Sequence, residues 1–118
     1  PIINDFWSLL HVAGLLLIAL ICLPAFGQYG PPKLSPEVKD ALIKQGKGLS
    51  RPCMSCHGLE KSSQWIYPNL GGQSSFYVQK QLKAFRDGGR KDPTMNAMAK
   101  NLSDDDIKAI ATFYESLK

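Results

Sequence analysis

Hydrophobic and polar residues are arranged in two different ways along this chain, and the change comes near residue 32. No Asp, Glu, Lys or Arg occurs between residues 6 and 32, and residues 6–27 are almost wholly apolar. A helix that crosses a bilayer needs about 20 such residues. After residue 32 the apolar positions recur every three or four residues, as in amphipathic helices. No segment alternates like a strand, so the pattern predicts an all-α protein.

The first amphipathic helix is predicted to begin at Ser35-Pro36-Glu37. Ser35 suits the helix cap, Pro36 the first helical position and Glu37 the first turn. The face predicted to be apolar consists of Val38, Ala41, Leu42, Gln45 and Leu49. Gly46 and Gly48 come late in this helix, where they either end it or allow close contact with another helix.

A second helix is predicted to begin at Ser74 or Ser75 and to run to about Asp87. Either serine suits a helix cap, and Gly88 and Gly89 are typical of a helix end. Its predicted apolar stripe consists of Tyr77 or Val78, Leu82 and Phe85.

The last helix is predicted to begin at Ser103. Ser103 suits the cap, Asp106 completes a pattern close to a capping box, and three consecutive aspartates favour the positive end of the helix dipole. The apolar face follows the helical period at Ile107, Ile110, Ala111, Tyr114 and Leu117. Residues 90–102, which come before this helix, are predicted to form a loop that carries Met95 and Met98.

The length of the chain indicates how many domains it forms, and its charge distribution indicates which kinds of partner it can bind. The 118 residues suffice for one domain, and the part after residue 32 allows only a limited core. All fourteen Lys and Arg residues, but only nine of the ten acidic residues, follow residue 32. The basic residues are scattered rather than grouped, which argues against nucleic acid as a partner. Some lysines are candidates for attracting an acidic partner: Lys44, Lys47, Lys61, Lys80, Lys83, Lys91 and Lys100.

The most specific motif is Cys-Met-Ser-Cys-His at residues 53–57. Cys-x-x-Cys-His is the attachment site of a c-type haem, in which each cysteine forms a thioether with one haem vinyl group. The histidine follows at once, so its imidazole reaches the iron as the proximal ligand. The motif therefore predicts one haem c, held covalently through Cys53 and Cys56, with His57 as an iron ligand.

Two other interpretations of the motif are less favourable. A thioredoxin-like redox pair accompanies a βαβ pattern, and no strand pattern flanks these cysteines. A zinc site needs further ligands, and the other Cys and His residues, Cys22 and His11, lie inside the apolar segment. Cys22 is interpreted there as a small apolar residue, and His11 as a residue facing a neighbouring subunit or the membrane edge.

The nature of the sixth iron ligand separates an electron carrier from an enzyme. A haem held by His57 alone can bind small gases or peroxide, whereas a methionine thioether closes the iron and raises its reduction potential. Met54 lies within the attachment motif and points away from the opposite face of the haem. Met95 and Met98 lie downstream and remain the candidates on residue type alone.

An ordered series of further motifs accompanies the attachment site. The chain resembles the class I cytochromes c, most closely the small bacterial members, over about residues 36–117. The shared motifs are Gly46-x-Gly48, Cys53-x-x-Cys56-His57-Gly58, Pro68-x-Leu70-x-Gly72-Gln73, Tyr77…Gln81-Leu82…Phe85-Arg86-x-Gly88, and Leu102-Ser103-Asp104 after the methionines.

The resemblance implies a class I cytochrome c fold around a covalent haem, together with roles for single residues. The carbonyl of Pro68 would accept a hydrogen bond from the second imidazole nitrogen of His57. Met95 would be the axial ligand, because it stands seven residues before Leu102, and Met98 is the runner-up. Gly46 or Gly48 would let the first and last helices cross near Phe113 or Tyr114.

The apolar N-terminal stretch is interpreted as a single transmembrane helix. Residues 1–32 would comprise this anchor and a short Gly/Pro linker, and residues 33–118 the cytochrome c domain. A cleaved signal peptide is less favourable, because residues 1–6 lack Lys and Arg and the apolar run exceeds a usual signal core. Bacterial c-type haem is attached outside the cytoplasmic membrane, as the resemblance implies, so we expect the haem domain on the periplasmic side.

These observations predict an electron-transfer protein rather than an enzyme. An anchored haem would serve as a subunit or close partner of a respiratory or photosynthetic membrane complex, such as an oxidase, a dehydrogenase or a photosynthetic centre. A haem peroxidase or gas-binding protein would need an acid–base residue beside an open iron, for which only Arg86, Arg90 and Asp92 are available. A mainly structural subunit of a membrane complex is the third hypothesis.

Overall fold

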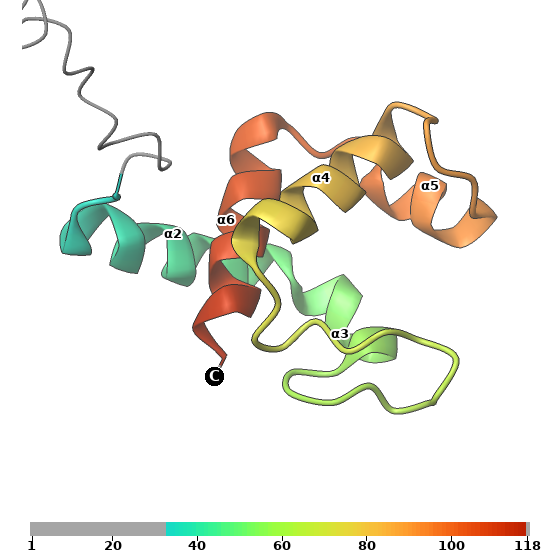
Figure 1. The fold of residues 1–118 in the computed structure, drawn as a ribbon, viewed down its shortest axis with the longest axis horizontal. Helices are drawn as coiled ribbons and strands as arrows, with labels where there is room; N and C mark the ends of the chain where they lie inside the picture. Colours follow the sequence, from blue (N-terminus) through green and yellow to red (C-terminus); the bar gives the residue numbers. More distant parts are fainter. Residues whose placement is uncertain (1–32, 118) are drawn as a thin grey trace, which may run out of the picture. The chain divides into compact units, whose positions relative to one another are not determined.

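The computed structural model describes residues 33–117 of the chain, and within this part it contains helices but no strand. The prediction of an all-α domain is therefore confirmed for these residues. The helices are α2 (Pro36–Leu49), α3 (Arg51–His57), α4 (Ser75–Arg86), α5 (Pro93–Ala99) and α6 (Asp104–Ser116) (Figure 1).

The predicted membrane anchor, with His11 and Cys22, lies outside the described residues. In the part of the chain that the structure describes, every helix is too short or too polar to cross a bilayer.

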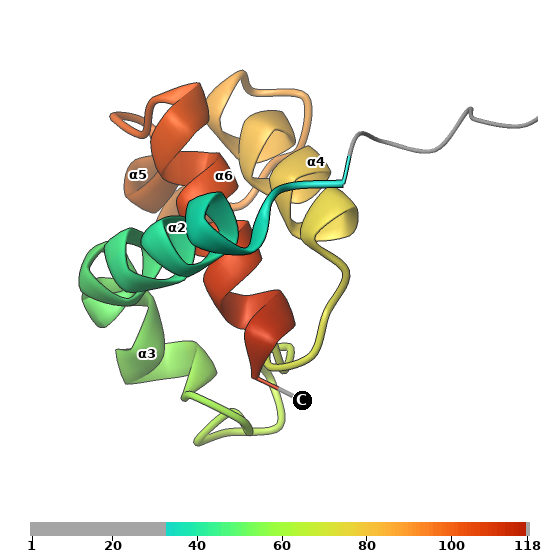
Figure 2. The same cartoon turned by 90° about the vertical axis from the view of Figure 1, so that its left-hand side faces the viewer.

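A glycine allows α2 and α6 to cross in direct contact (Figures 1 and 2). A Cβ atom at Gly46 would overlap the carbonyl oxygen of Ala109 and lie 2.8 Å from Cβ of Phe113. A Cβ at Gly48 would meet no atom within 4 Å. The sequence did not decide which of the two glycines lets the helices cross, and the structure shows that it is Gly46. Neither glycine ends α2, which continues to Leu49 and is capped by Ser50.

The buried face of α2 differs from the one predicted. Gly46 and Ser50 are buried and Leu49 is half-buried, whereas Val38 is 47 % exposed and Ala41 and Gln45 are exposed. The crossing at Gly46 determines which face turns inward. The N-terminal turns of α2 extend past α6 (Figure 1), so an apolar residue there has no helix to cover it.

Helix α6 forms the centre of the core and packs against α2 and α4. The predicted capping box is present: the backbone N–H of Asp106 donates to Ser103 Oγ (3.1 Å), and the N–H of Ser103 donates to Asp106 Oδ2 (3.0 Å). Ile107 and Tyr114 are fully buried and Ile110 almost so, which confirms the predicted apolar face.

Helix α4 begins and ends where the sequence predicts. Its first turn is stabilised from another helix, because the backbone N–H of Ser75 donates to the carboxylate of Glu115 in α6 (2.9 Å). Val78 rather than Tyr77 belongs to the buried face, with exposed fractions of 4 % and 48 %. Gly88 follows the helix with φ of +77°, a left-handed conformation that ends α4.

The predicted loop at residues 90–102 is wrong in part, because it contains the seven-residue helix α5. Asp92 caps this helix by accepting a hydrogen bond from the backbone N–H of Met95 (2.8 Å), and Pro93 occupies its first turn. Asp-Pro is a helix start, but the short, weakly periodic run after it does not distinguish a helix from a loop.

Candidate functional site

The Cys-x-x-Cys-His motif lies on the short helix α3, which directly follows α2. Ser50 joins the two helices: its carbonyl oxygen accepts hydrogen bonds from the backbone N–H groups of Cys53 and Met54 (both 3.0 Å). Cys53 and Cys56 are three residues apart and therefore lie on one side of a helix. Both are half-buried thiols without a disulfide.

The imidazole of His57 is oriented by a proline carbonyl. Nδ1 of His57 lies 2.8 Å from the carbonyl oxygen of Pro68. A carbonyl oxygen can only accept, so Nδ1 carries the proton and the lone pair of Nε2 remains free for a metal. The ring is 7 % exposed and packs edge-on against Tyr67, with ring centroids 6.1 Å apart. This is the hydrogen bond that the resemblance implies.

The segment between α3 and α4 is folded back onto the motif. Ser62 Oγ donates to the carbonyl oxygen of Cys56 (3.3 Å), and the backbone N–H of Ser62 donates to Asn69 Oδ1 (2.6 Å). The N–H of Gly72 donates to the carbonyl oxygen of Tyr114 in α6 (2.9 Å). These bonds bring Pro68, eleven residues after His57, back to the imidazole.

The three methionines have different surroundings. Met54 packs against the core of Ile110, Phe113 and Tyr114. Met95 and Met98 both lie on α5, where Met95 is half-buried and Met98 is 42 % exposed. Helices α3 and α5 lie on the same side of α6 in both views (Figures 1 and 2).

A protein-family model described as Cytochrome c matches residues 43–118 of this chain. The chain belongs to the cytochrome c family. It binds one haem c covalently through Cys53 and Cys56, and its family function is electron transfer. The site fits the cofactor, because it supplies two uncombined thiols at the required spacing and an imidazole whose Nε2 is free.

Individual cytochromes match most of the described region. Cytochrome c-554(548) of Halomonas halodenitrificans is 47 % identical over 68 residues, which are 54 % of this chain and 82 % of that protein. The cytochrome subunit of sulfide dehydrogenase of Chlorobaculum tepidum is 31 % identical over 86 residues, 73 % of this chain and 78 % of that protein. Reduced cytochrome c4 from Pseudomonas stutzeri superimposes with a TM-score of 0.62 at 34 % identity, covering 67 % of this chain and 50 % of that chain.

Two buried hydroxyl groups accompany the attachment motif of this cytochrome. Ser50 and Tyr114 are both 0 % exposed, and neither hydroxyl has a hydrogen-bond partner within the described residues. Burial raises the pKa of the Tyr114 phenol well above its ordinary value of 10.0, and nearby Cys53 adds to the rise. Burial also raises the pKa of the Cys53 thiol above 9.0. The Tyr114 phenol is therefore neutral at physiological pH, and so is the Cys53 thiol before it forms its thioether with haem.

The charged residues considered for enzymatic chemistry have structural partners. Arg86 forms an ion pair with Asp87 (2.8 Å) at the end of α4 and another with Asp104 (2.7 Å), which ties the end of α4 to the start of α6. The guanidinium of Arg90 lies 4.6 Å from the centroid of the Phe85 ring. Asp92 caps α5. Since each is engaged in holding helix ends, none is favoured as a catalytic acid or base.

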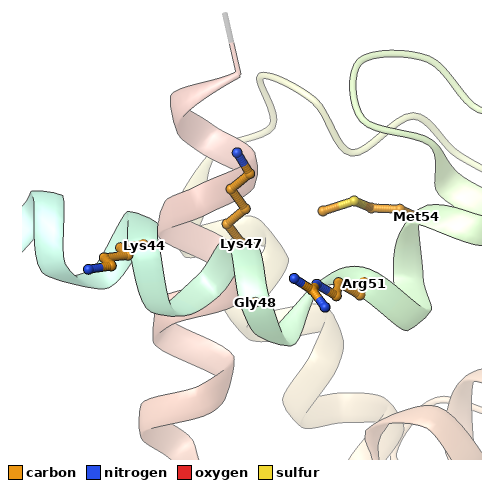
Figure 3. A pocket seen from close by; sticks show the side chains of 5 residues that line it. All are labelled: Lys44, Lys47, Gly48, Arg51 and Met54. Atoms are coloured by element: carbon orange, nitrogen blue, oxygen red, sulfur yellow. The ribbon is translucent and has the colours of Figure 1, made fainter.

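A basic hollow lies where α2 meets α3 (Figure 3). It has a volume of about 280 Å³ and is lined by Lys44, Lys47, Gly48, Arg51 and Met54. The side chain of Met54 extends toward Lys47 across this hollow. Two of the lysines predicted to attract an acidic partner thus lie beside the haem-attachment helix.

Proposed function

We propose that this cytochrome carries single electrons through a haem whose iron is ligated by His57 and Met95. The observation that carries the proposal is the 2.8 Å contact between Nδ1 of His57 and the carbonyl oxygen of Pro68, which leaves Nε2 free to ligate. When bound, haem supplies reversible one-electron chemistry, and a His/Met ligand pair raises its reduction potential. The thiols hold the group, Pro68 sets the tautomer and orientation of His57, and a methionine excludes other ligands.

Met95 suits the axial role better than Met98. Its side chain is half-buried, and its backbone N–H is held by the cap at Asp92. Met98 is 42 % exposed on the same helix. With Met95 as a ligand, the iron would be closed and no group would have to bind or leave during electron transfer, as a carrier rather than a peroxidase or a gas-binding protein requires.

The visible spectrum of the holoprotein tests this assignment in wild type, Met95→Ala and Met98→Ala. We expect the wild type to show the weak far-red band of a sulfur–iron bond and to resist carbon monoxide at neutral pH. Met95→Ala should lose the band and bind carbon monoxide, whereas Met98→Ala should behave as wild type. A wild type that lacks the band and binds carbon monoxide readily would instead indicate an open sixth position.

We further propose that residues 6–27 anchor the domain in the bacterial cytoplasmic membrane, with the haem domain on the periplasmic side. The apolar run and the short linker after it support the anchor. The periplasmic side is supported by the covalent haem, because bacteria attach c-type haem outside the cytoplasmic membrane. An anchored carrier suits a membrane redox complex of a respiratory or photosynthetic chain.

Among such complexes, we propose a dehydrogenase as the class of partner. One relative is named a cytochrome subunit of sulfide dehydrogenase, and another, from Thiomonas intermedia, a thiosulfate dehydrogenase electron acceptor. The basic hollow beside α3 supports a partner whose docking surface is acidic, because opposite charges favour encounter.

A further inference from the structure

The side chain next to Met95 binds α5 to the end of α4. Nδ2 of Asn96 donates to the carbonyl oxygens of Phe85 (2.6 Å) and Arg90 (2.8 Å). Oδ1 of Asn96 accepts from the backbone N–H of Asp92 (2.9 Å). We call these three hydrogen bonds the Asn96 clasp. They use both N–H donors of the amide and its oxygen, so one side chain closes the whole turn between α4 and α5.

Helix α5 depends on such contacts with the rest of the domain. It has seven residues, and a helix this short has little stability of its own. Among the described helices it packs only against α4. The clasp reaches Phe85, which is 7 % exposed and thus part of the rigid core. Breaking the clasp would free α5 to move while leaving the α2–α6 crossing unchanged.

We propose that Asn96 is a positioning residue that holds α5 so that the sulfur of Met95 stays on the haem iron. This inference rests on the ligation by Met95 proposed above. Asn96 itself touches neither haem nor iron in this role; it acts through the helix that carries the ligand. A weaker clasp should therefore increase the rate at which methionine leaves the iron, without changing which residue ligates.

The test uses the full holoprotein with Asn96→Ala and Asn96→Asp. Alanine removes all three hydrogen bonds, and aspartate keeps the acceptor for Asp92 while removing both donors. Asn101→Ala is the matched control, because Asn101 is an exposed asparagine on the same segment without a side-chain hydrogen bond in the described region. Two measurements are made: the rate of carbon monoxide binding to the ferrous protein, and hydrogen exchange of the α5 amides.

A typical hydrogen bond changes an equilibrium by a factor of roughly 2 to 12. We therefore expect Asn96→Ala and Asn96→Asp to bind carbon monoxide about tenfold faster or more, with α5 amides exchanging faster by a similar factor. Asn101→Ala should stay within about twofold of wild type. The far-red band should keep its position in all three variants, because Met95 still ligates.

Two results would overturn the inference and are distinguishable. If Met95→Ala loses the far-red band but Asn96→Ala binds carbon monoxide at the wild-type rate, Met95 is the ligand and Asn96 does not position it. If Met95→Ala retains the band and stays closed to carbon monoxide, the ligand assignment itself is wrong and the inference fails with it.

Discussion

At the scale of single residues, one missing methyl group permits the contact between α2 and α6, the two longest helices among the described residues. A Cβ at position 46 would overlap the backbone of Ala109, and backbone cannot rotate away as a flexible side chain can. Gly48, two residues later, faces open space. The two glycines therefore have opposite energetic roles within the same helix.

Gly46→Ala should destabilise the protein by about 1–3 kcal/mol, the usual cost of overpacking. Gly48→Ala is the matched control and should stabilise by about 0.5–1 kcal/mol, because alanine loses less conformational entropy in a helix than glycine. Denaturant unfolding of the two holoproteins measures both changes. Equal free energies of unfolding would show that α2 and α6 do not cross at position 46.

Another single-residue feature is the hydrogen bond that fixes the tautomer of His57. Pro68 has no N–H, so its carbonyl is the only backbone polar group it offers. Because the carbonyl oxygen of Pro68 can only accept, Nδ1 of His57 must carry the proton, and Nε2 is then the nitrogen that can ligate iron. The chemistry of the site is thus set by a backbone atom rather than by a second side chain.

At the scale of elements, the N-terminus of α6 is stabilised by hydrogen bonds that depend on ionisation. The hydroxyl and the backbone N–H of Ser103 both donate to Asp106 and lower the pKa of its carboxyl below the ordinary value of 3.8. Because the pKa of Asp106 is lower in the folded state than in the unfolded state, these hydrogen bonds contribute fully to the free energy of unfolding above about pH 4. Their contribution is lost as the pH falls through the folded-state pKa.

We expect Asp106→Asn to be less stable than wild type at pH 7, and the difference to shrink as the pH falls below about 4. Ser103→Ala should cost about 1 kcal/mol at pH 7 through loss of the cap. Thermal unfolding at several pH values measures both effects, and the acid sensitivity of the haem site cancels in the comparison. If the stability difference between wild type and Asp106→Asn did not change with pH, the role assigned to the ionised carboxylate of Asp106 would be wrong.

Helix α5 shows how an element can depend on tertiary contacts. Asp92 caps it, Asn96 binds it to α4, and Ala99 at its end is fully buried. A helix of seven residues without such contacts is marginal in water. The element that carries the proposed axial ligand is thus held in place by the residues on either side of that ligand.

At the scale of the whole molecule, the described core is concentrated on one helix. Six of the nine buried apolar residues belong to α6, and the other helices pack around it or around one another. The basic hollow lies at the junction of α2 and α3, and one of its lining residues, Met54, also packs against this core. The two lysines and the arginine that line the hollow are exposed, so their charges are accessible from solvent beside the haem-attachment helix.

The full chain should sediment with the membrane fraction and remain there after a high-salt wash, because apolar burial is insensitive to ionic strength. A variant in which a cleavable secretory signal replaces residues 1–32 should be released into the periplasmic fraction with its haem attached. Cell fractionation followed by haem staining measures this. Recovery of the full chain in the salt wash would mean that charge, rather than an anchor, holds it at the membrane.

The sequence by itself determined the helix starts at Ser35 and Ser103, the buried face of α6, and the chemistry of residues 53–57. Each of these depends on neighbours within a few residues, where capping and periodicity act. The choice of Pro68 and Met95 came from resemblance to a family rather than from local chemistry.

Only the tertiary structure decided which glycine makes the helix crossing, which face of α2 is buried, and that α5 exists. Gly46 and Gly48 are equivalent until α6 lies across one of them. Asn96 carries no local pattern, and its role arises because the end of α4 presents the carbonyls of Phe85 and Arg90 to it. Local sequence encodes helix ends, whereas contacts between helices depend on how the chain folds back on itself.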